Sequence, residues 1–222
     1  SDAENNLRLI QALGDDLQGP GTRFDWIEEG EKEAINRELD SVISGHNGPL
    51  VVLSPGTKRP SRAWPPQNFT EVAVKLNMMY GAKIIVVGTE TQKSLNEKIC
   101  NGHPFMVDFS GKTSIHGLAY VLSKSDLVIS VDSGPMHVAA AVGVPVVAIF
   151  GPGDYKVWKP YCKNPHVVSI LRQPPPCAPC LHYQCPRENH ECMEAISVEA
   201  VFSEAERLLR MTGKVTVKNS MN

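Results

Sequence analysis

The segment from residue 125 to residue 152 constrains the fold of this chain more than any other stretch. Leu127–Val131 and Pro145–Phe150 are short runs rich in β-branched residues, and each is typical of a buried strand. Between them, the residues from Ser133 to Pro135 are helix-start signals, and the short helix that they open ends at Gly143. Two buried strands joined through a helix predict a parallel sheet with a right-handed crossover.

The same alternation of strand and helix extends over most of the chain. It predicts an α/β fold in which helices cover both faces of a parallel sheet. Four more strands are predicted, at Leu50–Ser54, Ala82–Val87, Phe105–Phe109 and His166–Leu171. Apolar residues at helical spacing predict helices at Glu29–Ser44, Asn68–Tyr80, Thr91–Cys100, Ser114–Ser123, Met136–Val142 and 197–211.

The length and composition of the chain fit one core. With 222 residues and 42% apolar content, the chain can bury a single sizeable core, which we assign to residues 48–213. Residues 1–47 are acidic and weakly patterned outside the helix at Glu29–Ser44, although Asn5–Leu13 suggests a helix end and Phe24–Ile27 a short strand. Residues 214–222 form a tail.

Charge and hydropathy exclude two classes of protein. The net charge of −2 argues against a nucleic acid as the main partner. The sequence has no apolar run of about 18 residues, and its first residues lack the pattern of a signal peptide. We therefore predict a cytoplasmic protein.

The loops after the predicted strands are expected to form one site. In a parallel sheet the carboxyl ends of the strands share an edge, and ligands of such folds bind there. The loops over residues 56–62, 88–90, 110–113 and 132–137 should therefore meet at a single crevice.

The loop over residues 132–137 is suited to an anion. The first amides of the following helix have no internal acceptors and lie at the positive end of the helix dipole, so they stabilise a phosphate. Gly134 allows close approach, and Asp132 is expected to accept hydrogen bonds from ligand hydroxyls, so a sugar phosphate fits both. In the alternative, Asp132 and Ser133 only cap the helix and His137 is structural.

Two other loops have a functional and a structural interpretation. Lys58, Arg59 and Arg62 can hold a diphosphate, or they form a solvated basic loop. Glu90 can accept hydrogen bonds from ribose hydroxyls, or it only stabilises a helix N-terminus.

Two familiar nucleotide-binding motifs are missing from the sequence. The motif at residues 111–113 (GKT) lacks the earlier glycine of a phosphate-binding loop, which argues against an ATPase. The chain also has no G-x-G-x-x-G fingerprint, which argues against a nicotinamide or flavin dehydrogenase.

A cluster of four cysteines precedes the last helix. Soft thiolate ligands with a C-x-x-C spacing in the first pair are typical of a structural zinc site. The alternatives are reduced thiols packed in the fold, or disulfides formed during purification. The four residues are Cys177, Cys180, Cys185 and Cys192.

Three of these stretches together resemble one family, the family nine glycosyltransferases or lipopolysaccharide heptosyltransferases. The similarity lies in their carboxyl-terminal half and covers about residues 48–211. It is carried by the loop from Ser54-Pro55-Gly56 to Trp64-Pro65, by the DSGPMH box at residues 132–137 with Val144-Pro145 and Phe150-Gly151-Pro152 after it, and by the cysteine cluster that ends in Cys192-Met193.

The resemblance implies a GT-B enzyme, in which two Rossmann-like domains face a cleft and this chain is the half that binds the nucleotide-sugar donor. The implied donor is ADP-heptose, and the implied acceptor is the inner core of lipopolysaccharide at the cytoplasmic face of the membrane. The full-length enzyme would associate peripherally with that membrane. The implied chemistry requires no metal cofactor.

The resemblance also implies roles for single residues. Thr57 and Arg62 would contact the diphosphate or the sugar, Glu90 would hold the ribose, and Thr113 would lie near the adenine. The residues that would bind the sugar and the phosphates are Asp132, Ser133, Gly134 and His137.

Members of the family carry an amino-terminal domain that binds the acceptor and supplies an aspartate as general base for inverting transfer. Nothing in residues 1–47 resembles such a domain, so we expect these residues to be an interdomain connection and the chain alone to be inactive in transfer. Two other classes stay open: a sugar-nucleotide epimerase built on the same half-fold, and a non-catalytic nucleotide- or zinc-binding module.

Overall fold

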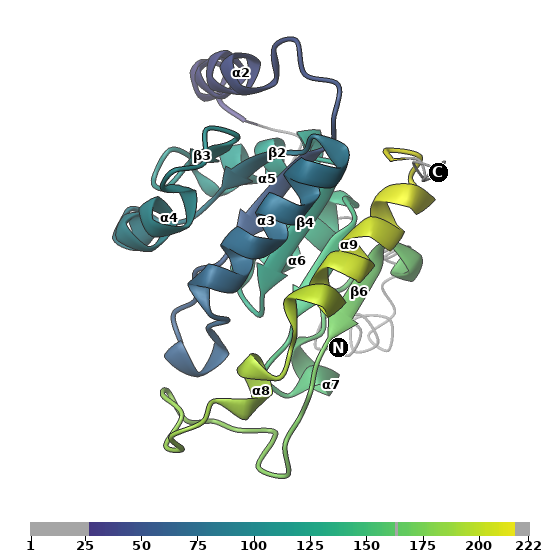
Figure 1. Ribbon diagram of the computed structural model, residues 1–222. Helices are drawn as coiled ribbons and strands as arrows, with labels where there is room; N and C mark the ends of the chain where they lie inside the picture. Colours follow the sequence, from purple (N-terminus) through teal and green to yellow (C-terminus); the bar gives the residue numbers. More distant parts are fainter. Residues whose placement is uncertain (1–26, 163, 216–222) are drawn as a thin grey trace, which may run out of the picture.

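A six-stranded sheet is the centre of the molecule (Figure 1). The computed structural model describes residues 27–162 and 164–215. All paired strands are parallel, in the order β3-β2-β1-β4-β5-β6, which is a Rossmann-like arrangement. The strands are β1 (Leu50–Ser54), β2 (Lys83–Val86), β3 (Met106–Asp108), β4 (Leu127–Val131), β5 (Val146–Ile149) and β6 (Val168–Leu171).

Helices connect the strands and flank the sheet. The longer ones are α2 (Glu29–Ile43), α3 (Pro66–Tyr80), α4 (Lys93–Cys100), α5 (Ile115–Lys124), α6 (Gly134–Val142) and α9 (Val198–Met211). Two helices of four residues, α7 (Tyr155–Trp158) and α8 (Glu191–Glu194), were not predicted, because so few residues show no helical period. The 3-10 turns lie at Pro60–Arg62, Glu90–Gln92 and Pro165–Val167.

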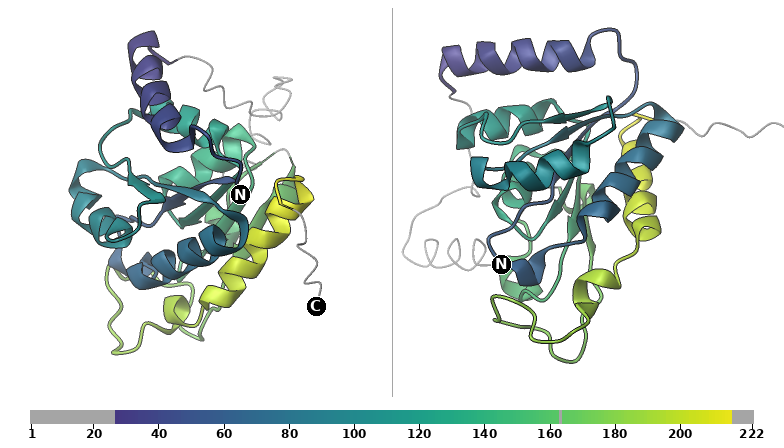
Figure 2. Two further views of the ribbon diagram at one scale, coloured as in Figure 1. Left: turned by 45° about the horizontal axis from the view of Figure 1, so that its top comes forward. Right: turned by 60° about the vertical axis from the view of Figure 1, so that its left-hand side comes forward.

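The sheet is covered on both faces because the side chains of each strand alternate. Val51 and Leu53 of β1 belong to the core beneath α3 and α9. Val52 belongs to the opposite core, beneath α2, α5 and α6. Figure 2 shows these helix layers on the two sides of the sheet, so the predicted α/β fold is confirmed.

The bounds of several elements differ from the predicted ones. α3 begins at Pro66 rather than Asn68, because proline suits the first helical turn, where its missing N–H costs no hydrogen bond. The start of the helix predicted from Thr91 belongs to the 3-10 turn before α4. β6 begins at Val168, after the 3-10 turn that includes His166.

Some predictions lie outside the described residues. They are the helix end at Asn5–Leu13, the strand at Phe24–Ile27 except for Ile27, and the tail beyond Val215. The helix predicted at Glu29–Ser44 is confirmed as α2, which packs against α5. Among the described helices, none has the length and apolar character that a membrane-spanning segment needs.

The strand order reverses between β1 and β4, and this reversal positions the site. The sheet continues from β1 to β2 on one side and from β4 to β5 on the other. In sheets of this type, a crevice forms at such a reversal, outside the carboxyl ends of the two strands. β1 ends at Ser54 and β4 ends at Val131, so the loops after these two residues border the crevice.

Trp64 anchors the loop between β1 and α3. Its side chain is 2% exposed, and its Nε1 donates a hydrogen bond to the Ile196 carbonyl at 2.9 Å. Its ring meets the Phe69 ring edge-on, with the two centroids 4.9 Å apart. The residues just before α3 are therefore attached to the segment that immediately precedes α9 (Val198–Met211).

We predict that Trp64→Phe lowers the free energy of unfolding by about 1–3 kcal/mol, because the Ile196 carbonyl stays buried without its donor. Chemical denaturation measures this change. Trp158→Phe is the control, since Trp158 is 47% exposed, and it should change the value by less than about 0.5 kcal/mol. Equal stabilities of the two variants would contradict the anchoring role.

Candidate functional site

A cavity of about 810 Å³ lies at the carboxyl edge of the sheet. The loops that follow β1, β2, β3 and β4 all contribute to its lining, which confirms that they meet at one crevice. The predicted site residues in the lining are Thr57, Arg62, Glu90, Thr113, Asp132, Ser133 and Gly134.

His137 is the predicted site residue that the structure places elsewhere. It is half-buried on α6 and absent from the cavity lining, because only the first turn of this helix, through Pro135, reaches the cavity. Burial lowers the pKa of His137, and the charge of Arg62 lowers it further. His137 is therefore a neutral imidazole near pH 7 that lies outside the cavity lining.

The start of α6 carries no side-chain cap. Ser133 is the N-cap residue, but its hydroxyl donates to the Val131 carbonyl at 3.3 Å instead of accepting from the helix. The Asp132 carboxylate contacts Arg62. The interpretation of Asp132 and Ser133 as simple capping residues is therefore wrong, and the positive end of the α6 dipole lies at the cavity wall, where it suits an anion.

Asp132 and Arg62 form a buried ion pair across the site. Asp132 is 3% exposed, and its Oδ2 lies 2.8 Å from Arg62 Nη1 in a geometry that is not that of a hydrogen bond. Burial raises the pKa of Asp132, whereas the positive charges of Arg62 and Arg59 act in the opposite direction. Because the Asp132 carboxylate is almost fully buried, it exposes little surface to ligand hydroxyls. Its charge instead holds the Arg62 guanidinium in place.

Gly153 packs directly against this ion pair, and sequence analysis did not identify it. A Cβ at this position would lie 2.6 Å from Asp132 Oδ2 and 3.7 Å from Arg62 Nη2. A side chain at residue 153 would therefore displace the Asp132 carboxylate, whereas the distance to Arg62 is an ordinary contact. The available signal was the Gly151-Pro152-Gly153 turn, which follows β5 at the same sheet edge.

Gln92 is a second residue that sequence analysis missed. It lines the cavity, and its Oε1 accepts a hydrogen bond from the Thr89 N–H at 3.0 Å, which completes a capping box. Its side chain fills the space beside Gly56 and Gly88, where Cβ atoms would collide with it. The Thr-x-x-Gln spacing is a capping-box signature and would have identified this residue.

The cavity combines charged and apolar walls. Lys58, Arg59 and Arg62 line it from the loop after β1, and Ile115 and Leu118 line it from α5. The Glu90 side chain, which also lines it, is 71% exposed and lies 3.8 Å from Lys93 Nζ, so its carboxylate can still accept hydrogen bonds from ligand hydroxyls. Such a lining suits a ligand that carries an anionic group and a flat apolar group.

The four cysteines of the predicted zinc site border a second cavity of about 360 Å³, together with His182 and His190. All four are free thiols. Burial raises the pKa of Cys192 to about 11, so its thiol is neutral near pH 7. In the part of the chain that the structure describes, no three His, Cys, Asp or Glu side chains are arranged to hold a metal ion, and the zinc site stays a prediction.

We predict that Gly153→Ala lowers the free energy of unfolding by about 1–3 kcal/mol, because the new methyl group displaces the Asp132 carboxylate or the turn. Thermal and chemical denaturation measure this loss. Gly134→Ala is the matched control, since no atom lies within 4 Å of a Cβ built there, and it should be nearly neutral. Equal effects of the two substitutions would contradict the close packing at Gly153.

The lowered pKa of His137 predicts a dependence of stability on pH. Below the ordinary histidine pKa of about 6.5, the unfolded chain protonates this residue while the folded chain keeps it neutral, so stability falls as the pH falls. Between about pH 7 and pH 5, the wild-type chain should therefore lose more unfolding free energy than His137→Gln. The same pH dependence in both proteins would show that His137 is not the group responsible.

Comparison with known proteins gives the family. The chain matches the model of glycosyltransferase family 9 (heptosyltransferase) over residues 4–191. A lipooligosaccharide heptosyltransferase 2 from Campylobacter jejuni is 31% identical over 169 residues, which are 74% of this chain and 52% of that protein. The chain thus spans about half the length of the curated relatives that it matches.

Solved structures share the fold. A family 9 glycosyltransferase from Veillonella parvula is 25% identical, with a TM-score of 0.74 over 92% of this chain and 58% of that chain. The ADP-heptose lipopolysaccharide heptosyltransferase II of E. coli is 22% identical, with a TM-score of 0.68 over 85% of this chain and 54% of that one. The family match, the sequence identity and the shared fold agree, and the chain belongs to glycosyltransferase family 9.

Proposed function

We propose that this chain binds the nucleotide-sugar donor of a heptosyltransferase, and that the donor is ADP-heptose. The observation that carries the proposal is the cavity, in which the uncapped start of α6, the basic loop after β1 and apolar residues of α5 line one space. The family, and relatives whose names include heptosyltransferase or ADP-heptose, support this choice of donor.

Different residues of the cavity lining suit the diphosphate, the ribose and the adenine of the donor. The diphosphate lies against Gly134, where no protein atom lies within 4 Å of a built Cβ, and faces the Arg62 guanidinium. The ribose hydroxyls donate to Glu90, and the adenine packs near Thr113 and Ile115. When the glycosidic bond breaks, the departing diphosphate gains negative charge, which the helix dipole and Arg62 stabilise.

We further propose that the acceptor is the inner core of lipopolysaccharide, bound at the cytoplasmic face of the membrane. Inverting transfer needs a general base at the acceptor hydroxyl, and we place this base outside the described residues. In this proposal the chain alone binds the donor without transferring the sugar. The family assignment does not favour the epimerase or the non-catalytic module.

Titration calorimetry tests the choice of ligand. ADP-heptose and ADP should bind, and UDP and GDP should bind at least about tenfold more weakly, because uracil covers less of the apolar wall at α5 than adenine does, and guanine brings an additional carbonyl and amino group to that wall. Equal affinity for all nucleotides would contradict the proposed adenine site. Failure of both adenine ligands to bind would contradict donor binding by this chain.

Gly134→Ala tests the position of the diphosphate. A methyl group enters the space that the phosphate needs, so we predict a loss of ADP affinity of about tenfold or more, with the free energy of unfolding nearly unchanged. Gly30→Ala is the control, since a Cβ at this α2 position also meets no atom within 4 Å. Gly134 is a better target than Arg62, whose loss would leave the buried Asp132 carboxylate unpaired.

If Gly134→Ala binds ADP as tightly as the wild-type chain, the phosphate does not lie at the start of α6.

A further inference from the structure

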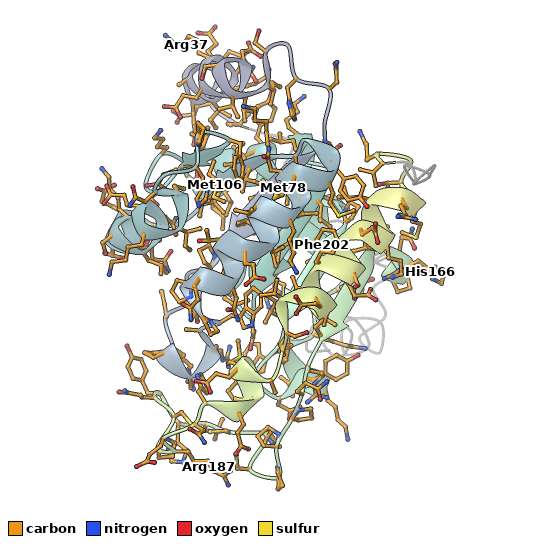
Figure 3. All side chains as sticks on the ribbon, viewed as in Figure 1. Arg37, Met78, Met106, His166, Arg187 and Phe202 are labelled. Atoms are coloured by element: carbon orange, nitrogen blue, oxygen red, sulfur yellow. The ribbon has the colours of Figure 1, made fainter. Side chains whose placement is uncertain are left out.

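The segment over residues 177–192, here named the cysteine segment, lies against the proposed donor site without lining it. In Figure 1 its lime-green loop lies beside the blue loop that precedes α3. Arg187, labelled in Figure 3, marks the segment at the lower end of the molecule. The hydrogen bonds between these two loops connect the cysteine segment to residues of the site.

Ser61 is bound to the cysteine segment through three polar groups. Its N–H donates to the Tyr183 carbonyl at 3.1 Å, and its hydroxyl donates to the His182 carbonyl at 2.8 Å. Its own carbonyl lies 2.8 Å from Nε2 of His190, which donates to it in the tautomer that carries the proton there. Because Ser61 is only 2% exposed, water cannot readily replace these bonds.

A second contact holds the other side of the site. The Cys180 N–H donates to the Pro152 carbonyl at 2.8 Å. Pro152 precedes Gly153, which packs on the buried ion pair, and Ser61 precedes Arg62, which is one half of that pair. The cysteine segment therefore fixes both loops that enclose the ion pair.

We propose that Ser61 and His190 are positioning residues for donor binding, which aim the Arg62 guanidinium at the diphosphate through the backbone that they hold. Neither residue lines the donor cavity, so neither is expected to touch the ligand. A guanidinium binds phosphate through a planar fork of donors, and small shifts of that fork weaken the contact. The inference rests on the proposed function, which supplies the ligand.

Four variants of the full chain, titrated with ADP in a calorimeter, test this role. His190→Ala should weaken ADP binding about tenfold, because the Ser61 carbonyl loses its donor and the loop can move. His190→Gln, whose amide can donate to the same carbonyl, should restore the affinity to within about threefold of wild type. Ser61→Ala should weaken binding about threefold or more, through loss of the hydroxyl bond.

His182→Ala is the matched control. It lies in the same segment and borders the same second cavity, but its bond to Ser61 uses the backbone carbonyl, which the substitution keeps. Its ADP affinity should equal that of the wild-type chain. Wild-type affinity in His190→Ala, or equal losses in His190→Ala and His190→Gln, would overturn the proposal.

A readout without nucleotide separates this inference from the proposed function. The NMR resonance of the Arg62 Nε–H reports the position of the guanidinium, and it should shift in His190→Ala and Ser61→Ala but not in His182→Ala. If the wild-type chain binds no ADP, the proposed function fails, and this comparison still decides the inference. An Arg62 resonance that does not move in His190→Ala would contradict it.

Discussion

The buried ion pair between Arg62 and Asp132 is the contact on which the site depends. It joins the loop after β1 to the loop after β4, on the two sides of the point where the strand order reverses. Breaking a buried ion pair by removing one partner costs about 3–5 kcal/mol, and less where one partner keeps contact with water, as the 19% exposed Arg62 does. The pair therefore fixes the two loops relative to each other as well as placing a cation in the cavity.

The rest of the fold supports this arrangement from behind. The parallel sheet is covered on both faces, so its strands are rigid and their carboxyl ends hold the loops at fixed positions. Glycines allow close packing around the site: Gly56, which lines the cavity, packs on Gln92, and Gly153 packs on Asp132. Hydrogen bonds to Ser61 and to the Pro152 carbonyl attach the cysteine segment to the two loops beside the ion pair.

Much of this structure could be predicted because its signals are local. Runs such as Leu127–Val131 and Leu50–Ser54 are continuous and β-branched, and the alternation with helices fixes a parallel sheet. Its topology then brings the loops to one edge, so most predicted site residues do line the cavity. His137 lies outside this lining, because a short motif in the sequence does not show where the helix leaves the cavity.

The contacts that could not be predicted join residues far apart in the chain. The turn at residues 151–153 shows that Gly153 follows β5, but not that it packs on Asp132, and nothing near Ser61 indicates that residues 182–190 will bind it. The ion pair itself joins residues 62 and 132, each of which has a separate interpretation when read alone. Such pairings depend on tertiary structure, which periodicity and spacing do not encode.

In the proposed function, an adenine nucleotide occupies the cavity at the start of α6. Chemical-shift mapping of the labelled chain during titration with ADP tests it most directly. We expect saturable shifts at the Gly134 amide, the Arg62 side chain and the Ile115 and Leu118 methyl groups. Shifts confined to the cysteine cavity, or no saturable shift at these four residues, would contradict it.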